Sequence, residues 1–249
     1  MLLKLSTGWV LRPGARTAGY RERGRSLLAV VRRHAFACGY LAAFAMTQAA
    51  YALLPAHAHM TVLSWASTSV ANLEHDPFVS LFLSALIVNG NSVAWLALVA
   101  VAVFGASRAA GNRRTAVICV AGHVIGTLVS EAIVAYRVDA GQLPPASNHL
   151  TDVGPSYLVV SALVLMLARG GPAIRLAAVT EFAVATLAGG IFAGLSRLDV
   201  AAVGHVAAIA TVVVSEGVAH AKADKVRDAR GADAQRDLAE GAAPERPAG

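Results

Sequence analysis

A serine and a histidine in the second half of the chain are of the types that carry out nucleophilic chemistry together. Ser156 follows Gly154 and Pro155, and His205 lies further along the chain. A neutral imidazole can take the proton of a serine hydroxyl and make its oxygen a nucleophile. Because Pro is favoured at the first turn of a helix, we expect a helix to start beside Ser156, where free N–H groups would stabilise an oxyanion. Alternatively, Ser156 only caps this helix and His205 only bonds to a neighbouring helix.

Other ionisable side chains lie within strongly apolar stretches, where polar groups are costly and become candidates for function. His123 and Glu131 are spaced to share one face of a helix, and Glu181 lies in a later apolar stretch. These intramembrane polar residues could form the relay of a proton-coupled transporter of small solutes. Against this, the chain shows no repeated halves. For His123 the alternative is a structural hydrogen bond between helices.

The sequence predicts no metal site, no cofactor and no binding of nucleic acid. One cluster of imidazole and carboxylate side chains lacks the spacing of established closed metal sites; it consists of His57, His59, Glu74 and His75. Cys38 and Cys119, which both fall in apolar stretches, form no disulfide framework. The net charge of +6 comes from basic residues that flank apolar segments, as in membrane proteins.

The composition indicates which elements must position these residues. Of the 249 residues, 56% are hydrophobic and only 14% are charged. In soluble domains roughly a quarter of all residues are charged. Residues 35–56 and 77–107 contain no charge, and about 20 apolar residues suffice to cross the hydrocarbon core as a helix. We therefore expect an all-α integral membrane protein in contact with membrane lipids.

Six transmembrane helices are predicted from the apolar segments. They lie at about residues 35–55, 92–106, 115–136, 155–168, 173–195 and 199–219. The fourth is short, at roughly 21 Å. Between the first two, residues 57–76 predict a helix in the membrane interface, followed by a partly submerged loop.

The distribution of charge predicts the orientation. Basic residues gather at the termini and in the loops after the second and fourth predicted helices, whereas acidic residues prevail on the other side. By the positive-inside rule, both termini are cytoplasmic. The domains expected are a basic cytoplasmic segment (1–34), a transmembrane domain (35–220) and a charged, disordered cytoplasmic tail (221–249). The Arg-rich start also fits a transit peptide, but a composition rich in Ala, Arg and Val favours a bacterial inner membrane.

Taken together, the pattern over residues 35–220 resembles the rhomboid family of intramembrane serine proteases, in its bacterial rhomboid-like branch. The resemblance rests on six spans, a long loop between the first two, the Gly154-Pro155-Ser156 start of a short fourth helix and an early histidine in the sixth. It implies a six-helix rhomboid-like bundle in which Ser156 and His205 form the catalytic dyad. The partners implied are client proteins with a transmembrane segment.

The chain also departs from the rhomboid pattern around the expected oxyanion site. Tyr157 stands where rhomboids usually have glycine, and residues 93–99 lack the His-x-x-x-Asn pair of their second helix. Loss of one oxyanion donor costs on the order of 100-fold in rate. Donors from loops could replace the pair, namely Asn89, Asn91, Asn148 and His149, with Gly154 supporting the site. Two readings stay open: a serine protease, or a pseudoprotease that binds client helices without cutting them.

Overall fold

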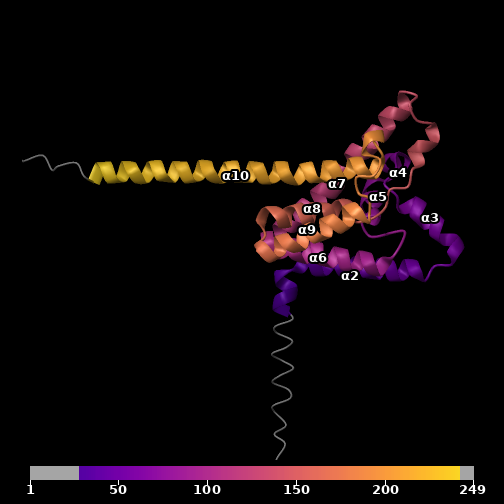
Figure 1. The fold of residues 1–249 in the computed structure, drawn as a ribbon, viewed down its shortest axis with the longest axis horizontal. Helices are drawn as coiled ribbons and strands as arrows, with labels where there is room; N and C mark the ends of the chain where they lie inside the picture. The colour runs from indigo at the N-terminus through magenta and orange to yellow at the C-terminus, as the bar shows by residue number, and fades with distance from the viewer. Residues whose placement is uncertain (1–27, 242–249) are drawn as a thin grey trace, which may run out of the picture.

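The structure, a computed structural model, describes residues 28–241, so that most of the predicted N-terminal segment lies outside it. The described residues form helices and loops without any strand (Figure 1). The α-helices are, in chain order, α2 (Ala35–Ala52), α3 (Ala56–Ala66), α4 (Val70–His75), α5 (Pro77–Ser84), α6 (Ser92–Ala110), α7 (Asn112–Asp139), α8 (Ser156–Arg169), α9 (Pro172–Leu187) and α10 (Val200–Gly241). Two short 3₁₀ turns, η1 (Pro145–His149) and η2 (Leu195–Arg197), lie before α8 and α10.

Three of the described helices, α6, α7 and α10, are long and apolar enough to cross a membrane. The shorter α8 is also apolar. α6 and α7 begin close to where the sequence predicted the second and third spans. Asn91 caps α6 by accepting hydrogen bonds from Val93 and Ala94 N–H. α9 ends at Leu187, earlier than the predicted fifth span, and irregular chain with η2 fills the interval to α10.

The short helix α8 lies at the centre of the bundle. It contacts α6, α7, α9 and α10, and Figure 1 shows α6, α8 and α9 side by side. Residues on every side of it, from Tyr157 to Met166, are buried. A helix that is apolar all round is expected at such a central position.

Glycines allow α7, α8 and α10 to approach closely. A methyl group at Gly122 of α7 would overlap Ser161 of α8. At Gly126 it would lie 2.9 Å from the carbonyl oxygen of Gly204 in α10 and 3.3 Å from the Tyr157 ring. Small residues at such contacts allow helices in membranes to pack by van der Waals contact.

The segment between α2 and α6 holds the turn that precedes α8. Thr68 N–H donates to the carbonyl oxygen of Asp152 at 3.0 Å, and Asp152 N–H donates to Ser67 Oγ at 2.8 Å. On the other side of this turn, Gly154 N–H donates to the carbonyl oxygen of Ser84 at 2.8 Å. The segment between α2 and α6 therefore fixes the backbone just before Ser156 from both sides.

α10 continues well beyond the bundle as a straight helix (Figure 1). The last span was expected to end near residue 219, with a disordered tail from residue 221, whereas the helix reaches Gly241. Ala, Arg and Lys, which favour helix, are frequent in this part, and the first proline after it is Pro244. Residues 221–230 are exposed.

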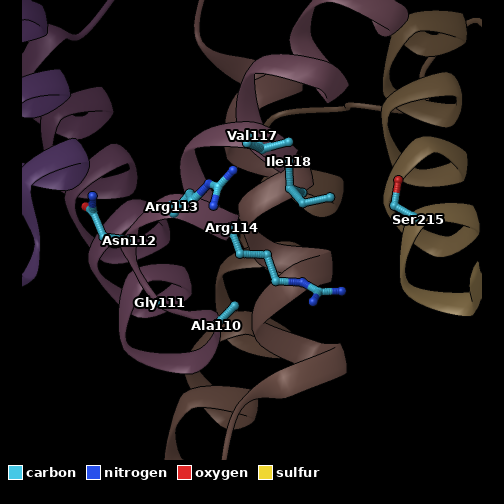
Figure 2. Close-up of a pocket in the computed structure, with 8 residues that line it drawn as sticks. All are labelled: Ala110, Gly111, Asn112, Arg113, Arg114, Val117, Ile118 and Ser215. Carbon is cyan, nitrogen blue, oxygen red and sulfur yellow. The ribbon is translucent and has the colours of Figure 1, made fainter. Parts of the chain in front are cut away.

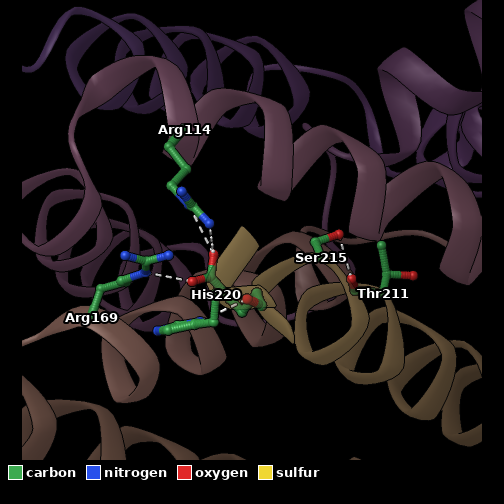
Figure 3. A network of polar contacts seen from close by, with 6 residues as sticks. Arg114, Arg169, Thr211, Ser215 and His220 are labelled. Carbon is green, nitrogen blue, oxygen red and sulfur yellow. Dashed lines mark hydrogen bonds and ion pairs between the residues drawn. The ribbon is translucent and has the colours of Figure 1, made fainter. Parts of the chain in front are cut away.

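At the opposite end of the bundle from Ser156, a buried carboxylate joins three helices. Glu216 of α10 forms ion pairs with Arg114 of α7, at 2.7 Å, and with Arg169 of α8. Figure 3 shows the two arginines converging on α10 from different helices, close to His220. We call Arg114, Arg169 and Glu216 the arginine clamp.

Candidate functional site

Ser156 is the first residue of α8 and is half-buried. The turn before it needs glycine, because Gly154 has φ +129°, a value that side chains rarely allow. Pro155 precedes the helix, and no side chain caps it. The first N–H groups of an α-helix have no partner within it, so that those beside Ser156 are free to bind a negatively charged oxygen.

His205 lies in the second turn of α10 with only 3% of its surface exposed. Its Nδ1 is 2.8 Å from the carbonyl oxygen of Ile191, in the loop after α9. Since a carbonyl oxygen only accepts, Nδ1 carries the proton of a neutral ring, and Nε2 keeps its lone pair. Nε2 is buried and has no hydrogen-bond partner among the described residues. This nitrogen is therefore able to act as a base.

Ser156 and His205 line the same cavity, of about 410 Å³, although no hydrogen bond joins them. α6, α8, α9, α10 and the loop after α9 all contribute to its wall. The other lining residues are Trp95, Leu98, Val159, Val160, Glu181, Val184, Ala185, Ala188, Gly189 and Ile191. The fold thus brings the two predicted dyad residues together at one opening.

Tyr157 connects His205 to the turn before α8. Its ring meets that of His205 edge-on, with 5.0 Å between ring centroids. Its hydroxyl donates to Asp152 Oδ2 at 2.9 Å. The bulk that the sequence places after Ser156 is accommodated because Gly126 and Gly204 face the ring. Burial raises the pKa of the Asp152 carboxyl above its ordinary value of 3.8, while hydrogen bonds from Tyr157 and Thr68 lower it.

The loop residues considered as oxyanion donors lie away from this cavity. Asn91 is exposed and caps α6, and Asn148 and His149 belong to η1. None of these three lines the cavity. From α6, the residues that face it are Trp95 and Leu98. Trp95 carries an indole N–H, which is a donor only. The sequence pattern does not mark Trp95 as a site residue, because it stands in a stretch without the His-x-x-x-Asn pair.

The predicted intramembrane polar residues do not form one group. Glu181 is buried and lines the cavity of Ser156 and His205. His123 lines a different cavity of about 630 Å³ between α2, α5 and α7, and its Nε2 donates to the carbonyl oxygen of Leu81 at 2.9 Å. Glu131 is buried and lines neither of these cavities.

A further cavity, of about 660 Å³, opens beside the arginine clamp. Figure 2 shows Arg113 and Arg114 at the start of α7 on one side of it and Ser215 of α10 on the other. This basic end of the bundle is opposite the end at which α8 begins. In residues 28–230, no group of three or more His, Cys, Asp or Glu side chains is placed to hold a metal ion.

Comparison with known protein families identifies a family for this chain. A family model described as rhomboid-like protein matches residues 29–223, more than three quarters of the chain. Searches among curated proteins and among solved structures found no match. The matched range includes α2 to the bundle part of α10, with both Ser156 and His205.

Proposed function

Because the chain belongs to the rhomboid-like family, we propose that it is an intramembrane serine protease with Ser156 as nucleophile and His205 as base. The observation that carries this proposal is the cavity that both residues line, with the unpartnered Nε2 of His205 in its wall. Substrates would be peptide bonds in or beside the transmembrane segment of a client protein.

The proposed reaction begins when His205 Nε2 takes the proton of the Ser156 hydroxyl. Ser156 Oγ then attacks the scissile carbonyl carbon, and His205 returns the proton to the leaving amine as the C–N bond breaks. Water, activated by the same nitrogen, hydrolyses the acyl-enzyme and frees Ser156. The hydrogen bond from Nδ1 to the Ile191 carbonyl oxygen holds the ring in the tautomer that this role requires.

Stabilisation of the oxyanion would come from the start of α8. Its free N–H groups lie beside Ser156, and the Trp95 indole N–H is the side-chain donor that α6 contributes to the cavity. This set replaces the His-x-x-x-Asn pair that rhomboids usually have.

We further propose six membrane spans, with both termini cytoplasmic, in a bacterial inner membrane. In this arrangement α2, α8 and α9 cross together with the three long helices. The basic residues of the arginine clamp lie at one end and Ser156 at the other. By the positive-inside rule the clamp end is cytoplasmic, and the cavity of Ser156 therefore opens toward the outer side.

The test is labelling of the purified protein with a fluorophosphonate probe, which reacts with activated serines. The parent is expected to be labelled. Ser156→Ala and His205→Ala are expected to lose the label, although both should elute from size-exclusion chromatography at the same volume as the parent. No labelling of the parent in any detergent or lipid would overturn the protease. Labelling that persists in His205→Ala would remove His205 from the dyad.

Two observations favour a second candidate, binding of client helices without cleavage. No hydrogen bond joins Ser156 and His205, and the asparagine donors expected from loops do not line the cavity. A client that co-purifies intact with the parent, and to the same extent with Ser156→Ala, would support this candidate.

A further inference from the structure

The cavity of Ser156 and His205 adjoins a second one, of about 700 Å³, between α6 and α9. The two cavities share Leu98, Glu181 and Val184 in their walls. Val101 and Leu176, which also line the second cavity, are among the exposed hydrophobic residues. The second cavity therefore opens on the apolar outer surface of the bundle and leads from there toward Ser156.

Glu181 is the ionisable residue at the junction of the two cavities. Only 5% of its surface is exposed, and neither carboxylate oxygen has a hydrogen-bond partner among the described residues. The remaining lining of the second cavity is aliphatic apart from Thr180. A carboxylate in such surroundings is costly unless a partner binds it. Glu216, by contrast, has two arginine partners within the chain.

We propose that Glu181 binds a lysine or arginine side chain in the transmembrane segment of the client, which enters between α6 and α9. A charge-assisted hydrogen bond is the strongest that a carboxylate can form, and the aliphatic walls suit the methylene stem of a basic side chain. This inference rests on the proposed function, in either its cleaving or its non-cleaving form, and adds the class of client.

The test measures binding apart from cleavage. The full chain carrying Ser156→Ala is placed in lipid nanodiscs with synthetic transmembrane peptides. The peptides share one Leu/Ala sequence and differ at one central position, which is lysine, norleucine or glutamate. We expect the lysine peptide to bind about tenfold more tightly than the norleucine peptide. Glu181→Gln, nearly the same in shape, should abolish this preference, and Glu181→Lys should transfer it to the glutamate peptide.

Glu131→Gln is the matched control, because Glu131 is buried to a similar degree and lines neither cavity. It should keep the lysine preference. Equal binding of all peptides by the parent, a preference that survives Glu181→Gln, or a loss in both glutamine variants would each overturn the proposal. Failure of the protease proposal can be distinguished from failure of the Glu181 proposal. If only the protease proposal fails, the parent remains unlabelled by fluorophosphonate while the lysine preference persists.

Discussion

Tyr157 links the histidine of the site to the turn that precedes the serine. Its ring contacts His205, and its hydroxyl donates to the Asp152 carboxylate, which Thr68 in the loop between α3 and α4 also contacts. A displacement of this loop would therefore reach His205 through a single side chain. Asp152 is the carboxylic acid in this chain of contacts.

Replacing Asp152 by asparagine should remove one pH-dependent contribution to stability. Burial raises the pKa of this carboxyl above 3.8 in the folded protein, so the folded state binds the proton more tightly than the unfolded state. The contribution of Asp152 to the free energy of unfolding therefore falls as the pH rises from about 3.8 through the raised pKa, and then levels off. In thermal unfolding scans in detergent, the stability of the parent relative to Asp152→Asn should decrease over this range. An increase with pH would contradict the assignment.

At the scale of helices, the packing of α8 on α10 depends on the absence of a side chain at Gly204. A methyl group there would overlap the Tyr157 ring. We expect Gly204→Ala to lower the free energy of unfolding by about 1–3 kcal/mol, as overpacking of a core does, and to weaken fluorophosphonate labelling by displacing the ring from His205. The free energy of unfolding is measured by chemical unfolding in mild detergent, and labelling by the fluorophosphonate probe, both on the purified variant.

Gly217 provides the control on the same helix. A methyl group added there would meet nothing within 4 Å, and alanine favours helix over glycine. Gly217→Ala should therefore leave stability and labelling as they are or raise stability slightly. If both variants behaved alike, the contact of Tyr157 with Gly204 would not be what limits the approach of the helices.

The helices themselves could be predicted in large part from the sequence. Apolar stretches and the signals at Asn91 and Pro155 place the starts of α6 and α8. The site could be predicted only in outline, because loop contacts are not local in sequence. Asn91 is an example: an asparagine before an apolar run is a capping signal, and its side chain caps α6 and does not line the cavity. Glu181 was recognised as polar, but its place beside Ser156 depends on how α9 packs.

At the scale of the whole molecule, the arginine clamp joins the start of α7 and the end of α8 to the middle of α10. Glu216 is nearly buried and has two partners, and we expect Glu216→Gln to cost roughly 1–3 kcal/mol, between the values of exposed and fully buried pairs. Asp224→Asn is the control, because the Asp224–Arg227 pair further along α10 is exposed; it should cost almost nothing. Chemical unfolding in mild detergent measures both, and equal effects would contradict a stabilising clamp.

The length of α10 has a mechanical consequence. The clamp holds this straight helix at Glu216, about 16 Å from His205 and about 38 Å from Gly241 at 1.5 Å per residue. The arm toward His205 packs against α7 and α8, whereas residues 221–230 of the other arm are exposed. A sideways force on the exposed arm would therefore load the contacts of α10 with α7 and α8, among them the contact of Gly204 with Tyr157. Whatever pulls on that arm thereby acts on the distance between His205 and Ser156.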